Sequence, residues 1–255
     1  PEQLAAAIRR VCLAGRGFPV LCGSAYRCIG IQPLLDAVLA YLPSPLDLPP
    51  VAGRARDEPE KTVTRRPTPQ SPLAALAFKI LFDKHGDLTF LRVYSGQLAA
   101  GSRVYNATRD RKERVDRLFL MHADERESVA QAGPGEIVAA TGFKFTVTGD
   151  TLCTEEAPIL LEPPKFPDTV VSMAIEPKTN DDKDRLARAL GRLAKEDPTF
   201  AHHYNQETGQ TIISGMGELH LEIIRAKLTR EHSVEANIGQ PRVSYREALT
   251  AAAQA

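Results

Sequence analysis

The sequence predicts a multidomain chain made of an α/β unit, an all-β barrel and an α+β unit with the strand and helix order βαββαβ. Three observations lead to this prediction. The 255 residues exceed the needs of one small core, the spacing of apolar residues changes along the chain, and proline-containing stretches separate the changes. The formal net charge is zero, so any contact with RNA would have to use local patches of charge.

The four cysteines, Cys12, Cys22, Cys28 and Cys153, include no C-x-x-C pair. This pattern argues against a disulfide scaffold or a zinc ribbon, and we expect a reducing, cytoplasmic compartment and no metal site. No apolar run approaches the roughly 20 residues that a membrane-spanning helix needs. The chain begins with Pro1 and has no signal-like segment. We interpret it as an internal fragment of a longer protein and expect a monomer.

Residues 1–48 have the pattern of helix, strand and helix. Residues 4–12 are rich in Ala and Arg at helical spacing, residues 18–22 form a short apolar run, and residues 34–42 place leucine and valine on one face. This pattern predicts an α/β unit with one buried strand. Residues 49–72 hold six prolines and almost no large apolar side chains, which predicts a linker that is extended or mobile.

Residues 73–163 change to strand signals. Residues 73–81 are an apolar run, residues 88–94 are rich in β-branched and aromatic residues, and turn residues recur at intervals of about ten residues. Short, evenly spaced strands without a long helical stretch predict a small barrel.

Residues 167–247 alternate between strand and helix signals. Residues 170–175 are typical of a strand, and Thr179-x-x-Asp182 resembles a capping box ahead of a helix with leucines at i, i+4 and i+7. A hairpin, a second helix from about Gly217 and a last strand over 234–238 complete the order βαββαβ. This is the ferredoxin-like arrangement.

A series of short strings then suggests a family. In chain order the strings are Gly23–Ala25, Gly30–Asp36, Tyr41–Pro45, Arg92–Gly96, Met121–Ala123, Thr148–Leu152, Glu176–Lys178, Glu196–Phe200, Glu207–Gln210, Ser214–Glu222 and Tyr245–Glu247. Together they resemble the elongation factor G family of translational GTPases, in that family's own order. The resemblance implies the C-terminal part of a GTPase domain over 1–48, a linker over 49–72, a β-barrel domain over 73–163 and a ferredoxin-like domain over 167–247.

The resemblance also assigns a nucleotide contact. In this family the loop that matches Gly23–Ala25 touches the guanine base, which implies guanine contacts for Ser24 and Ala25; taken alone, a Gly-Ser-Ala string is also compatible with an ordinary tight turn. The sequence contains no G-x-x-x-x-G-K-[ST] phosphate loop. The resemblance implies that GTP and magnesium are cofactors of the full-length protein. Because the phosphate loop is missing, we expect neither of them to bind this fragment and no catalytic residue to lie in it.

Five cations are concentrated in one stretch, with three acidic residues between them. The cations are Arg109, Arg111, Lys112, Arg114 and Arg117, and the acids are Asp110, Glu113 and Asp116. One interpretation is an edge that contacts phosphates and binds ribosomal RNA. The other is a solvated, charge-balanced hairpin that resists edge pairing. The sequence leaves both open.

The string Ser214–Glu222 invites a metal interpretation through Glu218, His220 and Glu222. No H-E-x-x-H is present, and residues two apart on a helix do not share a face, so we expect no metal there. Gly215 and Gly217 are better explained by a tight strand-to-helix turn and close packing.

The same string has a second implication through the resemblance. In the family this helix borders the cleft that holds fusidic acid, and Leu219 and His220 match residues near it. The resemblance places Asp197 and Thr199, from the string Glu196–Phe200, near the same cleft.

For the full-length protein the resemblance implies GTP-dependent movement of transfer RNA and messenger RNA on the ribosome, with the barrel against RNA and proteins of the small subunit. We expect a hinge at the proline-containing junction Glu162–Pro167. Two alternatives stay open. The first is a paralogue for ribosome recycling or tetracycline-type ribosome protection, and the second is a non-enzymatic module that binds RNA or protein.

Overall fold

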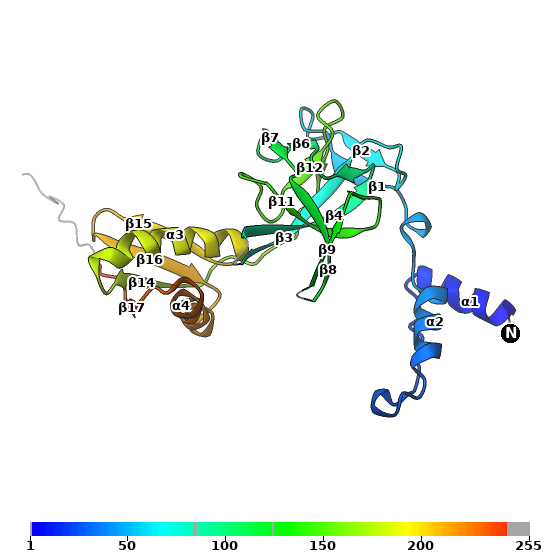
Figure 1. The fold of residues 1–255 in the computed structure, drawn as a ribbon, viewed down its shortest axis with the longest axis horizontal. Helices are drawn as coiled ribbons and strands as arrows, with labels where there is room; N and C mark the ends of the chain where they lie inside the picture. Colours follow the sequence, from blue (N-terminus) through cyan, green and yellow to red (C-terminus); the bar gives the residue numbers. More distant parts are fainter. Residues whose placement is uncertain (1, 84–85, 124, 244–255) are drawn as a thin grey trace, which may run out of the picture.

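The computed structural model describes residues 2–83, 86–123 and 125–243. Figure 1 shows a pair of N-terminal helices at one end, a strand-rich unit in the middle and an α/β unit at the other end. Among the helices in these ranges, none is both long and apolar enough to cross a bilayer. The predicted string Tyr245–Glu247, and with it the predicted domain limit at 247, lies outside the described residues.

The N-terminal part consists of helices α1 (Glu2–Leu13) and α2 (Ile31–Tyr41) with the short turns η1 (Ala25–Arg27) and η2 (Pro45–Asp47). The strand predicted over 18–22 is wrong, since this run pairs with no strand of the described chain and its Phe18 and Val20 are 88% and 89% exposed. Backbone N–H and C=O groups need a neighbouring strand to form a sheet. Neither α1 nor α2 contains a buried residue.

The central unit is an antiparallel barrel, as predicted. Its strands are β3 (Ala74–Asp83), β4 (Gly86–Ser95), β5 (Leu98–Ala99), β6 (Arg103–Asn106), β7 (Arg111–Arg114), β8 (Arg117–His122), β9 (Glu125–Val129), β10 (Gln131–Ala132), β11 (Ile137–Thr141) and β12 (Thr151–Cys153). One sheet has the order β7-β6-β12-β3-β4-β11-β8-β9, and β5 pairs with β10. Side chains alternate along a strand, so Leu91, Val93 and Leu118 point into one shared core.

Residues 49–72 contain two paired strands, which corrects the prediction that this stretch is only an extended or mobile linker. Strands β1 (Val51–Arg54) and β2 (Thr62–Arg65) pair with each other, and β1 also pairs with β13 (Leu160–Leu161). Val51 and Val63 pack against a buried cluster of the barrel. The partner strand lies about a hundred residues further along the chain, so local composition did not indicate the pairing.

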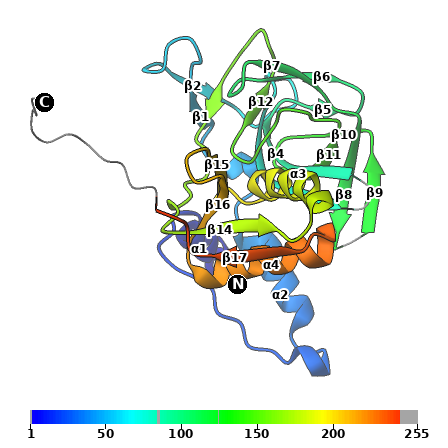
Figure 2. The ribbon, with the colours of Figure 1, turned by 90° about the vertical axis from the view of Figure 1, so that its left-hand side faces the viewer.

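The C-terminal part has the predicted ferredoxin-like order. Its elements are β14 (Val171–Pro177), α3 (Asn180–Glu196), β15 (Ala201–Asn205), β16 (Gln210–Gly215), α4 (Glu218–His232) and β17 (Ala236–Gly239). The strands pair antiparallel in the order β15-β16-β14-β17. Ile175 and Ile213 of the sheet share one core with leucines of both helices, so α3 and α4 cover the same face (Figure 2).

Thr179 is the N-cap of α3, as half of the predicted capping box, and the hydrogen bond from the Thr179 N–H to the Asp182 side chain that would complete the box is not among the contacts of the described residues. The Thr179 hydroxyl accepts from the Asp182 N–H at 3.3 Å and donates to the Asp182 carboxylate at 2.6 Å. The helix lies against β3 of the barrel (Figure 1), where the Arg192 guanidinium lies 5.9 Å from the centre of the Phe82 ring. The barrel and the α/β unit nevertheless have separate hydrophobic cores.

Burial along α4 predicts a contrast between two leucine substitutions. Leu228 is 1% exposed and Leu219 is 70% exposed. Leu228→Ala should lower the free energy of unfolding by about 2–5 kcal/mol through lost burial and a cavity, whereas Leu219→Ala on the same helix should change it by less than about 0.5 kcal/mol. Urea unfolding measures both, and equal losses would contradict the packing of α4.

Candidate functional site

Three of the predicted site residues meet where α3 ends and α4 begins. Asp197 follows the last residue of α3. Its Oδ1 accepts from the Thr199 N–H at 2.8 Å and from the Thr199 hydroxyl at 2.6 Å. Its Oδ2 lies 3.0 Å from His220 Nε2, so one carboxylate joins the turn after α3 to the first turn of α4.

The backbone of the turn before α4 fixes the tautomer of His220. The Met216 N–H donates to His220 Nδ1 at 3.1 Å, so Nδ1 carries no proton. The proton of the neutral ring is then on Nε2, which donates to Asp197. The imidazole therefore links the β16–α4 turn to the end of α3 through two directed hydrogen bonds.

The carboxyl group of Asp197 is held in its ionised form. Burial acts to raise the pKa of Asp197, but hydrogen bonds from the Thr199 hydroxyl and N–H, together with the hydrogen bond from His220, leave this pKa below its ordinary value. The carboxylate is thus an acceptor at neutral pH and holds both partners in place.

Gly215 provides the space that this arrangement needs. A Cβ at Gly215 would lie 2.8 Å from His220 Nδ1 and 2.9 Å from Leu221 Cδ2. A side chain here would displace the imidazole or the buried leucine, which agrees with the interpretation that glycine allows close packing at this turn.

An apolar surface borders the Asp197–His220 pair. Leu219, Ile223 and Met216 are 70%, 48% and 38% exposed, so Leu219, the fourth residue predicted here, points outward. Within the described ranges no three His, Cys, Asp or Glu side chains gather in a way that could hold a metal ion. The exposed leucine beside two directed hydrogen bonds suits recognition by packing and hydrogen bonding.

The predicted basic stretch does not form one patch. Strand β7 pairs with β6 and is the edge of the eight-stranded sheet. Because side chains alternate along a strand, Arg111 shares a face with the buried Glu113, whereas Lys112 and Arg114 point to the other face. Arg117 lies on a different strand, β8, with its guanidinium 5.8 Å from the Phe119 ring centre.

Three of the five predicted cations have acidic partners. The ion pairs are Arg109–Asp150 at 3.2 Å, Lys112–Glu155 at 2.7 Å and Arg114–Asp116 at 3.4 Å. A charged edge strand of this kind resists pairing with another sheet. The paired cations Arg109, Lys112 and Arg114 support the charge-balanced hairpin. The interpretation as an RNA contact keeps support from Arg111 and Arg117, which lie beside aromatic rings.

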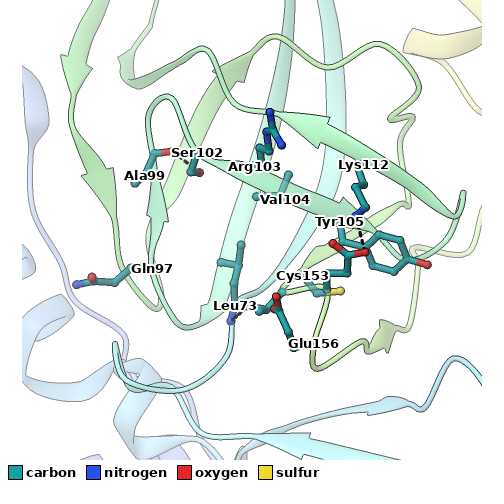
Figure 3. A pocket seen from close by; sticks show the side chains of 12 residues that line it. Leu73, Gln97, Ala99, Ser102, Arg103, Val104, Tyr105, Lys112, Cys153 and Glu156 are labelled. Atoms are coloured by element: carbon teal, nitrogen blue, oxygen red, sulfur yellow. Dashed lines mark hydrogen bonds and ion pairs between the residues drawn. The ribbon is translucent and has the colours of Figure 1, made fainter.

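One face of the β6–β7 hairpin borders a hollow of about 310 Å³. Figure 3 shows Arg103 and Lys112 on the hairpin, with Tyr105 beside Cys153 and with Glu156 near them. Cations thus line this hollow, but the pairing of Lys112 with Glu155 neutralises part of their charge.

The loop with Ser24 and Ala25 has a closed backbone geometry. The Ser24 N–H donates to the Ile29 carbonyl at 2.9 Å, and the Ser24 carbonyl accepts from the Ile29 N–H at 3.0 Å. Both backbone groups of Ser24 are therefore occupied within the loop. A guanine contact at this residue would have to use its hydroxyl group.

Two site residues were not singled out by the sequence as loop anchors. Glu113 and Asp150 are 5% and 2% exposed and accept hydrogen bonds from the loop that leads into β12. Glu113 had been interpreted as one of the charges of a solvated hairpin. Its spacing of two residues from the apolar Val115, which places both on one face of a strand, was the signal in the sequence that it faces inward.

Comparison with known proteins places these features in a family. The family model for elongation factor G domain 2 matches residues 72–155, and the model for elongation factor G domain III matches residues 166–240. These ranges cover the barrel and the α/β unit in the family's order. The chain belongs to the elongation factor G family.

Individual relatives of the elongation factor G family agree with the domain matches. Two proteins named elongation factor G, from two strains of Dehalococcoides mccartyi, are 52% and 51% identical over all 255 residues. The chain spans 37% of the length of each. A crystal structure of a protein from Thermus thermophilus has a TM-score of 0.73 and 28% identity, covering 95% of this chain and 34% of that one.

The Asp197–His220 pair predicts a pH-dependent contribution to stability. The pKa of Asp197 is lower in the folded chain than in the unfolded one, so its stabilisation is present above the unfolded pKa of about 3.9 and is lost as the pH falls through the folded pKa. Asp197→Asn should lower the free energy of unfolding at pH 7 by about 1–3 kcal/mol, the cost of unmatched polar groups.

Urea unfolding at pH 7 and at pH 3 tests this prediction. The difference in the free energy of unfolding between wild type and Asp197→Asn should be smaller at pH 3 than at pH 7. The control Asp168→Asn changes an exposed carboxyl group and should have the wild-type free energy of unfolding at both pH values. A gap that stays constant with pH would show that the ionised carboxylate does not stabilise this junction.

Proposed function

We propose that the full-length protein is a ribosomal translocation factor that uses GTP and magnesium to move transfer RNA and messenger RNA during elongation. The observation that supports this proposal is the pair of domain matches, in family order, on a barrel and an α/β unit. Identity of 52% across the whole chain to a protein named elongation factor G adds to it. A factor of this kind would act on ribosomes in the cytoplasm.

We propose the same domain division as the resemblance implied. Residues 1–48 would be the C-terminal part of a GTPase domain, followed by the joining segment 49–72, the barrel over 73–163 and the ferredoxin-like domain over 167–247. The exposed apolar side chains of α1 and α2, among them Leu34, Leu35 and Leu39 at 45%, 57% and 81%, support this assignment. The remainder of a nucleotide-binding domain would cover them. Ser24 and Ala25 would then lie beside the guanine base.

The Asp197–His220 pair would lie at the contact between the third domain and the GTPase domain. Its two directed hydrogen bonds and the neighbouring exposed Leu219 suit a surface that is covered in one nucleotide state. Asp197, Thr199, Leu219 and His220 would also border a fusidic acid site. The barrel would contact RNA and proteins of the small ribosomal subunit.

Poly(U)-directed polyphenylalanine synthesis tests the proposed activity. Ribosomes supplied with the full-length protein should complete many elongation cycles, because a translocase is required in each cycle. A paralogue for ribosome recycling or for tetracycline protection would leave synthesis at the level without the factor. That result, obtained with active ribosomes and a known translocase as control, would reject translocation.

Nucleotide binding should separate the fragment from the full-length protein. The 255 residues lack the phosphate loop, so no backbone N–H groups can surround the phosphates. Titration of the chain with GTP and magnesium in a calorimeter should give no binding heat, whereas the full-length protein should bind. Measurable GTP binding by the 255-residue chain would contradict this expectation.

A further inference from the structure

The loop of residues 142–150 is held by a buried carboxylate at its start. Glu113 Oε1 accepts from the Phe145 N–H at 2.8 Å, the Thr146 N–H at 2.8 Å and the Thr146 hydroxyl at 3.0 Å. Its Oε2 accepts from the Lys144 N–H at 3.0 Å. Glu113 is 5% exposed, and a buried carboxylate with four donors fixes the backbone that supplies them.

A second buried carboxylate holds the other end of the loop. Asp150 is 2% exposed and accepts from the Val147 N–H at 2.9 Å, from Asn106 Nδ2 at 3.0 Å and from Arg109 Nε at 3.2 Å. Asn106 Nδ2 also donates to the Thr146 hydroxyl oxygen at 3.1 Å. The loop is therefore ordered before any ligand arrives, which removes a cost of binding.

This ordered loop presents an aromatic ring to solvent. Phe145 is 52% exposed, and the Arg111 guanidinium lies 5.7 Å from the centre of its ring. Lys144 beside it is also exposed. Two buried acids thus hold in place a ring that is itself left half uncovered, with cations next to it.

Two exposed cations lie next to Phe145: Arg111, which contacts the ring, and Lys144, its neighbour in the sequence. Arg109 is also exposed, but its guanidinium is paired with the buried Asp150 at 3.2 Å. The charge of Asp110, which precedes Arg111 in the sequence, is balanced by Arg56 at 2.7 Å. Lys112 and Arg114 point to the other face of β7 and pair with Glu155 and Asp116.

A lone exposed aromatic among cations favours a nucleotide over a protein surface. Among the described residues between 73 and 163, Ile137 and Phe145 are the only large hydrophobic side chains that are exposed, so no contiguous apolar patch surrounds the ring. An unpaired base can stack on an aromatic side chain while neighbouring cations contact its phosphates. Guanidinium groups add stacking and charge.

We propose that Phe145 and Arg111 form a stacking contact for an unpaired nucleotide of ribosomal RNA. The inference rests on the proposed function, since it assumes that the barrel meets the ribosome, and it names the side chains and the kind of RNA that this contact uses. The remaining face of β7, with Lys112 and Arg114, is outside the contact.

Tryptophan fluorescence tests the contact directly, because the chain contains no tryptophan. In the Phe145→Trp variant of the 255-residue chain, the indole is the only one present, and stacking on a base should quench its emission when small ribosomal subunits are added. Phe166→Trp, at a side chain 41% exposed outside the barrel, is the matched control and should not be quenched.

Affinity measurements supply the second readout. Binding to small subunits, followed by sedimentation, should weaken about 5- to 150-fold in Phe145→Ala, the range expected for loss of one stacked base. Phe145→Tyr should bind like wild type, and Lys112→Gln should stay within about twofold at the same salt concentration. Arg111→Gln should weaken binding and reduce its dependence on salt.

The outcomes separate this contact from the proposed function. Sedimentation with subunits but no quenching of Phe145→Trp would overturn the contact and leave ribosome binding intact. Ultraviolet crosslinking of the introduced indole in that variant to a ribosomal protein instead of RNA would also overturn it. Failure of the wild-type chain to sediment with subunits would reject both the contact and binding of the ribosome by this barrel.

Discussion

Each of the two folded units closes its own hydrophobic core, and this separation constrains the rest of the molecule. Leu91, Leu118 and Leu152 are completely buried within the barrel, and Ile213 and Leu221 within the α/β unit. Most of the large apolar side chains of each unit are therefore buried in that unit's own core. What remains for recognition lies at strand ends, at helix ends and in loops, where polar groups must be satisfied individually. The N-terminal helices, which bury no side chain, are the exception that depends on a further surface.

Carboxylates order the loops that carry the candidate sites. Three carboxylates are partly or fully shielded from water in the folded chain: Glu113, Asp150 and Asp197. Each of them accepts hydrogen bonds from nearby backbone N–H groups or from side-chain donors. A buried charge without such donors would be costly, so the loop conformation and the ionised acid stabilise each other. The same device places Phe145 on the barrel and His220 at the start of α4. Hydrogen bonds to these acids therefore set the positions of both side chains.

The sequence predicts this molecule best where the pattern is local. Spacing of leucines indicated α3 and α4, and Thr179 with Asp182 marked the start of α3. Contacts between residues far apart in the sequence were harder to predict. The pairing of β1 with β13 joins residues about a hundred positions apart, and 18–22 lacks a partner strand among the described residues. For the site, resemblance indicated Asp197 and His220, but only the fold shows that they touch. If side-chain alternation along a strand had been applied with Glu113 facing inward, it would have separated Arg111 from Lys112 and Arg114.

The junction between the barrel and the α/β unit combines a covalent link with a weak contact. Residues 162–167 join the two units without a helix or strand, and Arg192 lies over Phe82 where α3 meets β3. An exposed cation–π contact contributes about 0.5–1 kcal/mol, close to the thermal energy. Such a contact can set a preferred orientation without preventing another, while both cores stay intact. A hinge at this junction, which we propose from its prolines, therefore requires no loss of packing within either unit, and the reorientation would carry the Asp197–His220 pair with it as one piece.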